Sequence, residues 1–127
     1  MLCKELQFGD WCCDLHGFPM QRTNVGDDYA YATFEGNEGD PWEFDDKDDQ
    51  PQPIPLTAEI LEKNGWEHNG IFMDKMIGEN IFFSWSDKFG AELYQNNYYM
   101  CYCKYVHTLQ HALHLCGFDE LAENFKV

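Results

Sequence analysis

The chain has 127 residues and a formal charge of −15, from 23 acidic and 8 basic residues, with 44% hydrophobic and 17% aromatic residues. This length predicts one domain or two closely packed modules, and the apolar content suffices for a folded core, which argues against intrinsic disorder. With so few basic residues the chain lacks a positive stripe that neutralises phosphates, so neither broad nucleic-acid binding nor attachment to an acidic membrane is expected.

The chain begins MLCKE, without an apolar run behind a basic start, and no apolar stretch approaches the roughly 18 residues of a membrane-spanning helix. Six cysteines occur without any Cys-x-x-Cys spacing. We therefore expect a cytoplasmic protein whose thiols are reduced and mostly buried. A zinc site built from cysteines and a histidine is the weaker alternative, because structural zinc sites usually use Cys-x2-4-Cys pairs.

Short strands separated by turns are expected in the first third of the chain. A turn at Gly9-Asp10 leads into the apolar residues 11–13, and a second turn at 16–19 precedes a strand at 20–25. In the following segment, 29–34, alternate aromatic residues share one face, as in a strand. Several strands at this spacing predict a small barrel-like sheet.

Residues 27–49 hold ten acidic residues against Lys47 alone. Trp42 and Phe44 interrupt this charge at a spacing of two, which is typical of a short edge strand. We expect this surface to block a protein partner that has a basic groove, with fast docking by electrostatic steering. The candidate partner-binding residues are Asp40, Trp42, Glu43, Phe44, Asp45, Asp46, Asp48 and Asp49.

Two plainer interpretations of the acidic segment stay open. It can be a solvated loop that keeps the protein soluble, or a loose site for a hard cation. An EF-hand is not indicated, because Lys47 lies in the middle of the carboxylates and prolines follow them.

A connector with three prolines, residues 50–55, separates a small acidic β module (1–50) from an α+β module (51–127) that packs on it, unless both form one domain. A helix is predicted over 58–64, with Thr57 as its N-cap and Gly65 as its stop. Strands follow at 70–73, 81–85, 91–95 and 98–104 and form an antiparallel meander. A helix over 106–116 and a short turn at 119–124 complete an α+β fold.

Three histidines lie on one side of the last predicted helix, because His107, His111 and His114 fall within about 60° of one another. The apolar residues cluster on the opposite side, so the histidines should face solvent or a partner. A solvated polar face is the favoured interpretation, a partner contact the second and a metal site the third, since this face offers no second-shell acceptor. We assign no metal and no cofactor.

The aromatic residues exceed what a small core needs, and tyrosines at alternating positions cannot all point inward. Aromatic faces stack bases, so an aromatic pocket that sequesters a nucleotide-like small molecule is the alternative function. Its candidate residues are Trp85, Tyr94, Tyr98, Tyr102, Lys104 and His107. A housekeeping adaptor without a ligand is a third alternative, and a homodimer is compatible with all three.

Catalysis is not expected. No Gly-x-Ser-x-Gly elbow, phosphate-cradling glycine loop or His-Glu-x-x-His occurs, and Ser84 and Ser86 are the only serines. A cysteine nucleophile, Cys12 beside His16, stays open because catalytic partners meet in space.

Three patches, in this order, resemble motifs of one family. They are ELQFGDW at 5–11, PIPLT at 53–57 with Leu61 and Gly65-Trp66, and YVHTLQ at 105–110. Together they are similar to a group of small uncharacterised proteins of Bacteroidetes and their phages. The resemblance implies a small β module joined to an α+β module and no known activity. A phage setting implies a protein that interferes with a host component, including host defence or its nucleotide signal.

Overall fold

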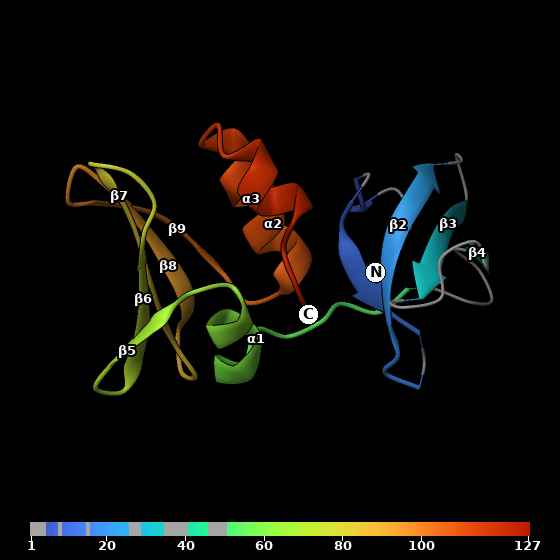
Figure 1. The fold of residues 1–127 in the computed structure, drawn as a ribbon, viewed down its shortest axis with the longest axis horizontal. Coiled ribbons are helices and arrows are strands. Elements are labelled where there is room, and N and C mark those ends of the chain that lie inside the picture. Colours follow the sequence, from blue (N-terminus) through green and yellow to red (C-terminus); the bar gives the residue numbers. More distant parts are fainter. Residues whose placement is uncertain (1–4, 8, 15, 26–28, 35–40, 46–50) are drawn as a thin grey trace.

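In the computed structural model the described residues are 5–127 except 8, 15, 26–28, 35–40 and 46–50, and residues 23–25, 29–34 and 41–45 are described by their backbone alone. Two antiparallel sheets form the two ends of the molecule, and helices lie between them (Figure 1). The chain is therefore an α+β protein, as the sequence predicts.

The N-terminal sheet contains four strands in sequence order: β1 (Trp11–Cys13), β2 (Pro19–Val25), β3 (Tyr29–Phe34) and β4 (Pro41–Asp45). The predicted strands at 20–25 and 29–34 are confirmed, and so is the short edge strand around Trp42 and Phe44. The sheet runs from β1 to β4 without a pairing between these two edges in the part of the chain that the structure describes, so no closed barrel is found there.

The proline-rich connector packs against both halves of the molecule. Gln52 exchanges two backbone hydrogen bonds with Cys13, at 2.9 and 2.8 Å, and Pro55 forms a bridge with Tyr105. Ile54 and Leu56, on either side of Pro55, are buried in the core. The connector is therefore an extended segment held on its two sides.

Helix α1 (Ala58–Lys63) begins where the sequence predicts and ends one residue earlier, with Asn64 as its C-cap. The Thr57 hydroxyl accepts the backbone N–H of Ile60 at 3.3 Å, and Gly65 follows the helix with a φ of 82°. This left-handed conformation favours glycine and ends the helix. Leu61 is fully buried and attaches α1 to the core.

Five strands form the C-terminal meander, in the order β5 (Glu67–Asn69), β6 (Phe72–Met76), β7 (Ile81–Ser86), β8 (Gly90–Gln95) and β9 (Tyr98–Cys103). The last three confirm the prediction within a residue or two. The strand predicted at 70–73 is displaced, because Gly70 and Ile71 form the turn between β5 and β6. β5 is an addition, since its three residues are polar and exposed and give no alternating pattern.

Helix α2 (Val106–Leu115) lies between the two sheets and contacts both β1 and β9, and helix α3 (Asp119–Glu123) replaces the predicted turn (Figure 1). The α2 residues Val106 and Leu109 are fully buried, as is Phe83 of β7. Among the helices in the described part of the chain, none is long and apolar enough to cross a membrane.

One buried side chain, Gln110 of α2, joins the N-terminal sheet to the C-terminal half. Its Oε1 accepts the Trp11 backbone N–H at 2.9 Å, and its Nε2 donates to the carbonyls of Gly9 at 3.0 Å and Ala122 at 2.9 Å. The Trp11 indole N–H donates to the Phe125 carbonyl at 2.7 Å. Gly9 and Trp11 are thereby fixed to α2 and to the segment after α3.

Candidate functional site

The five-stranded sheet has one face against the helices and one open face. The helices α1, α2 and α3 all lie on the same side of this sheet (Figure 1). Residues that point toward them are buried, namely Met73, Phe83, Trp85 and Leu93. Because successive side chains of a strand point to opposite faces, the residues that alternate with these lie on the open face. They are Asp74, Phe82, Ser84, Glu92 and Tyr94.

A row of aromatic rings crosses three strands on the open face. Phe82 of β7 is paired with Tyr94 of β8, and Tyr94 is paired with Tyr99 of β9. The ring centroids are 6.3 Å apart in the first pair and 5.9 Å apart in the second. At these separations the rings contact one another, so the row is a continuous aromatic surface.

A cavity of about 550 Å³ lies beside this row. Its lining residues are Lys88, Phe89, Glu92, Tyr99, Tyr102 and Lys104. Phe89, Tyr99 and Tyr102 are each about half exposed, at 53%, 52% and 56%. The volume lies in the range of ordinary ligand sites, about 300–1,000 Å³.

Gly90 allows the two sides of this cavity to approach each other. Its φ is 76°, and a Cβ at this position would lie 2.7 Å from the Cys103 carbonyl oxygen and 3.3 Å from the Lys104 Cγ. Only glycine combines this conformation with so close an approach. The turn that carries Lys88 and Phe89 can therefore lie against β9.

Both lysines of the cavity lie beside aromatic rings. Lys88 Nζ is 5.3 Å from the centroid of Phe89, and Lys104 Nζ is 5.9 Å from the centroid of Tyr102. The only ion pairs within the described part of the chain join histidines to carboxylates, so neither lysine is paired with a carboxylate described here. Both ammonium groups are available to an anion that stacks on the rings.

Glu92 is the one carboxylate in the cavity lining, and one of its oxygens accepts a hydrogen bond from Tyr94. The Tyr94 hydroxyl donates to Glu92 Oε2 at 3.0 Å. This hydrogen bond, together with desolvation, raises the pKa of Tyr94, and desolvation raises the pKa of Tyr99. Tyr94 and Tyr99 are therefore neutral at physiological pH and present uncharged rings.

Of the six ligand-binding residues that the sequence proposes, the structure brings only some together. Tyr94, Tyr102 and Lys104 lie together at the open face. Tyr98 is 75% exposed at the start of β9, Trp85 is buried on the opposite face, and His107 is buried in α2. The cavity is completed by Lys88, Phe89 and Tyr99, which the sequence analysis does not propose. The inward position of Trp85 follows from strand alternation, because it lies two residues after the buried Phe83.

The partner-binding residues proposed from the sequence fall mostly on undescribed positions. Asp40, Asp46, Asp48 and Asp49 lie outside the described residues. Trp42, Glu43, Phe44 and Asp45 belong to β4, which is described by its backbone and pairs with β3.

The histidines of α2 do not form one solvent-facing row. His107 is 8% exposed and stacks on Tyr105, with the ring centroids 6.1 Å apart. His111 Nε2 lies 2.5 Å from Asp10 Oδ2, whereas His114 Nδ1 lies 2.7 Å from Asp119 Oδ1. The expectation that all three face solvent or a partner is wrong for His107 and His111, because the β1 segment covers this side of α2.

The buried and half-buried thiols are poorly suited to nucleophilic chemistry. Burial raises the pKa of Cys103 to about 12 and also raises the pKa of Cys13 and Cys116. Cys12, considered beside His16 as a nucleophile, is fully buried, whereas His16 is exposed. A thiol needs its thiolate form and access to the substrate to attack it.

The open-face cavity combines exposed aromatic faces with two ammonium groups, and this pairing can hold a flat, anionic ligand by stacking and by charge. Glu92 adds acceptors for hydroxyl or amino groups of such a ligand. Comparison with models of protein families, with curated proteins and with solved structures finds no match to this chain.

Proposed function

We propose that this protein is a non-catalytic binding protein that holds a nucleotide-like small molecule in the open-face cavity. The observation that carries the proposal is the pairing of each cavity lysine with an aromatic ring, Lys88 with Phe89 and Lys104 with Tyr102. A base stacks on Tyr99 or Tyr102, the phosphate lies between the two ammonium groups, and Glu92 accepts from ribose hydroxyls.

The expected affinity is moderate because each contact contributes little. Stacking of one base contributes about 1–3 kcal/mol, and an exposed ion pair contributes about 0.2–1 kcal/mol. Loss of the Tyr102 ring should therefore weaken binding by about 5- to 100-fold, and loss of the Lys104 charge by less than tenfold.

The test is calorimetric titration of the protein with mononucleotides and cyclic nucleotides, compared with inorganic phosphate and with nucleosides. Tyr102→Ser and Lys104→Met should weaken nucleotide binding, whereas the matched control Lys63→Met, which removes the same charge far from the cavity, should not. Added salt should weaken binding. No detectable heat with any nucleotide at millimolar concentration would overturn the proposal.

A protein of this kind acts as a sponge that lowers the free concentration of its ligand. The resemblance to proteins of Bacteroidetes and their phages leads us to extend the proposal to a phage- or mobile-element-borne protein in the cytoplasm, acting on a nucleotide signal of host defence. The free thiols of Cys13, Cys101, Cys103 and Cys116 are consistent with a reducing compartment.

A second function is favoured by a different observation. β4 lies at the edge of the N-terminal sheet, paired with β3 alone among the described strands, and its sequence alternates Trp42 and Phe44 with Glu43 and Asp45. We propose that this acidic edge, on a module with barrel-like curvature, docks on the basic groove of a host protein and blocks it.

The acidic edge predicts binding that falls steeply with salt. Capture of a partner from host lysate at low and high salt is the first measurement. The double variant Glu43→Gln/Asp45→Asn should reduce capture, and Glu120→Gln/Glu123→Gln on α3 is the control with the same charge change. Capture that survives both high salt and the β4 variant would contradict an electrostatic blocker.

A further inference from the structure

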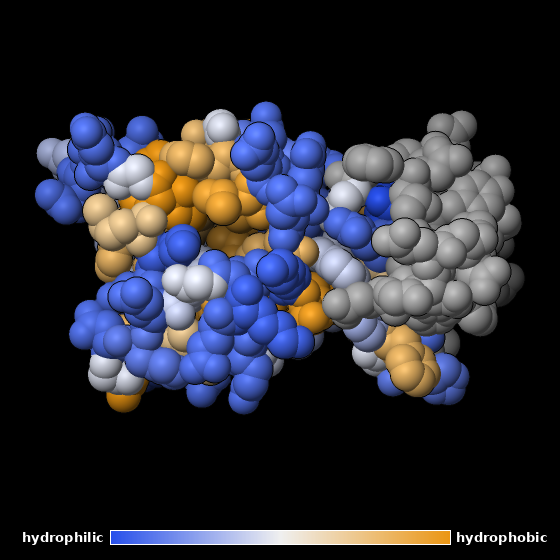
Figure 2. Space-filling view, viewed as in Figure 1, coloured by the Kyte–Doolittle hydropathy of each residue, from blue (hydrophilic) through white to orange (hydrophobic). Residues whose placement is uncertain are grey.

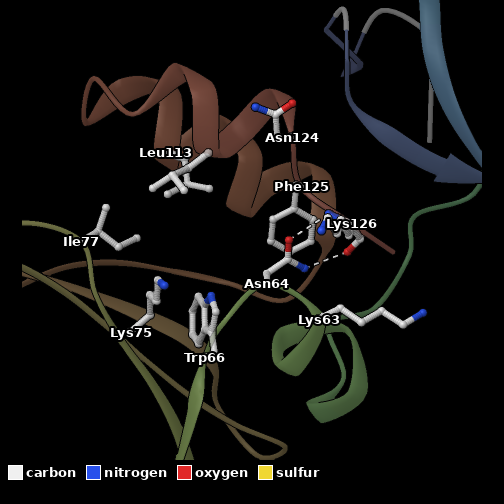
Figure 3. A pocket seen from close by; sticks show the side chains of 10 residues that line it. Lys63, Asn64, Trp66, Lys75, Ile77, Leu113, Asn124, Phe125 and Lys126 are labelled. Carbon is white, nitrogen blue, oxygen red and sulfur yellow. Dashed lines mark hydrogen bonds between the residues drawn. The ribbon is translucent and has the colours of Figure 1, made fainter.

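A second cavity, of about 250 Å³, opens between the inner side of the five-stranded sheet, the end of α1 and the helices α2 and α3. Figure 3 shows Trp66, Lys75, Ile77, Leu113 and Phe125 around it, whereas the Lys63 side chain points away from them. It lies on the opposite side of the sheet from the open-face cavity, because Trp66 and Ile77 line it together with the α2 residue Leu113.

The floor of this cavity is apolar. Trp66, Ile77, Leu113 and Phe125 line it and are all buried. In the space-filling view, apolar side chains gather between the sheet and α2 and α3, with hydrophilic residues around them (Figure 2). A floor of this kind stabilises an apolar or aromatic body that is withdrawn from water.

The rim of the cavity is positively charged. Lys63, Lys75 and Lys126 line it, and none of its lining residues is a carboxylate. By contrast, the three other concavities contain Glu79, Glu92, or Glu67 with Asp74, and Lys75 also lines the last of these. In a chain with 23 acidic and 8 basic residues, three lysines at a cavity without a carboxylate form a local reversal of charge.

The wall that carries Lys126 is held in place by one amide. Asn64 Nδ2 donates to the carbonyls of Ile60 and Lys126, both at 2.8 Å, and Asn64 Oδ1 accepts the Lys126 backbone N–H at 2.8 Å. Figure 3 shows these bonds between Asn64 and Lys126. This wall of the cavity is therefore held by the protein's own hydrogen bonds, which lowers the entropic cost of binding.

The lysines differ in their availability. Lys63 Nζ donates to the Val127 carbonyl at 3.2 Å. Lys75 Nζ lies over the backbone of Gly65, 3.1 Å from where a Cβ would stand, beside the Trp66 side chain. The ammonium of Lys75, half-buried at the rim, is thus the natural partner for the anionic end of a ligand whose body enters the floor.

We propose that this second cavity binds a small aryl carboxylate, with its ring on the floor between Trp66 and Phe125 and its carboxylate at Lys75 and Lys126. A volume of about 250 Å³ is below the roughly 300–1,000 Å³ of sites for larger ligands, so a whole nucleotide does not fit, whereas one ring system with a short acidic chain does. The neutral floor and the cationic rim together select an amphipathic anion over a bare phosphate.

The test is titration of the ¹⁵N-labelled protein with four probes: phenylacetate, indole-3-acetate, the neutral benzyl alcohol and inorganic phosphate. The two carboxylates should bind and shift the amide signals of Trp66, Lys75 and Phe125. Benzyl alcohol should bind at least fivefold more weakly, and phosphate should not shift these signals. Equal affinity for the alcohol, or shifts with phosphate alone, would overturn the proposal.

Lys75→Met retains the apolar stem and removes the charge, so it should weaken carboxylate binding at least fivefold and leave the affinity for benzyl alcohol unchanged. Lys126→Met should do the same to a smaller extent, and the amide spectrum reports whether each variant is folded. The control Lys88→Met, which affects the open-face cavity, should leave the carboxylate-induced shifts of Trp66, Lys75 and Phe125 unchanged. Carboxylate affinity that is unaltered in both Lys75→Met and Lys126→Met would contradict the assignment, whatever the outcome for nucleotides.

Discussion

Gln110 is the residue on which the contact between the two halves depends most. A primary amide offers two donors and one acceptor with two lone pairs, and here both donors and the acceptor are used at a site that is 1% exposed. The Gly9 carbonyl also accepts from Gln21 Nε2, so it keeps a partner without Gln110. The Trp11 backbone N–H would lose its hydrogen-bond partner, because its acceptor is Gln110 Oε1.

Gln110→Ala should lower the free energy of unfolding by about 2–4 kcal/mol, because it leaves a buried N–H without an acceptor and opens a cavity. Urea unfolding followed by far-UV circular dichroism measures the change. Gln95→Ala, at the exposed end of β8, is the control and should change the same quantity by less than about 0.5 kcal/mol. Similar effects of the two substitutions would contradict the role of Gln110.

His107 should make stability depend on pH. Burial, and next the charge of His111, lower the pKa of His107 below its ordinary 6.5, although Asp10 and Glu5 oppose this shift. Below pH 6.5 the unfolded chain therefore binds this proton before the folded chain does, so the free energy of unfolding falls as the pH falls from 7 toward the lowered pKa.

His107→Gln removes the titration and should flatten the decline of the urea midpoint between pH 7 and pH 5.5, a window in which most carboxylates stay ionised. Gln95→Ala, which removes no titratable group, is the control and should leave the slope as it is. A slope that His107→Gln does not alter would show that other groups cause the pH dependence.

At the scale of single elements, the β8–β9 hairpin is the clearest case of local sequence dictating structure. Its two-residue turn, Asn96-Asn97, has φ values of 52° and 68°, and two left-handed residues are what a type I′ hairpin requires. Asparagine tolerates this conformation better than other residues with a Cβ, and glycine tolerates it best.

Asn97→Gly should raise the free energy of unfolding by about 0.5 kcal/mol, whereas Asn97→Ala should lower it by about 1 kcal/mol, because alanine has a Cβ and lacks the compensating amide. The two midpoints of urea unfolding measure this difference in sign. Alanine as stable as glycine at this position would contradict the turn assignment.

The elements that the sequence predicts best are those with their own local signals. Thr57 and Gly65 delimit α1, and Asn96-Asn97 defines a hairpin, because each acts on the backbone around it. β5 has no such signal, since its residues are polar on both faces and it forms only by pairing with β6. The burial of His107 likewise depends on a segment about a hundred residues away, beyond any helical periodicity.

The candidate site likewise contains features that the local sequence predicts and features that depend on the tertiary structure. The exposure of Tyr102 and its neighbours could be predicted, because tyrosines at successive positions of one strand cannot all enter a core. The participation of Lys88 and Phe89 could not, since the conformation of Gly90 brings their turn against β9. The second cavity joins residues from α1, β6, α2 and the segment after α3, and only the tertiary structure assembles them.

For the whole molecule, the decisive property is how the few cations are distributed. All five lysines in the described part of the chain line a cavity, Lys75 two of them, and none forms an ion pair with a carboxylate described there. The lysines therefore do little to neutralise the acidic surface. Carboxylates on a compact molecule repel one another more than on an expanded chain, so this charge opposes folding.

Salt should consequently act in opposite directions on stability and on nucleotide binding. Raising NaCl from 20 to 300 mM at pH 7 screens the mutual repulsion of the carboxylates and should raise the urea midpoint, and this gain should shrink near the sequence pI of about 4.4. The same salt screens Lys88 and Lys104 from a phosphate and should weaken nucleotide binding. A urea midpoint that falls with salt at pH 7 would contradict this prediction. It would mean that the charge interactions that salt screens are, on balance, attractive and stabilise the fold.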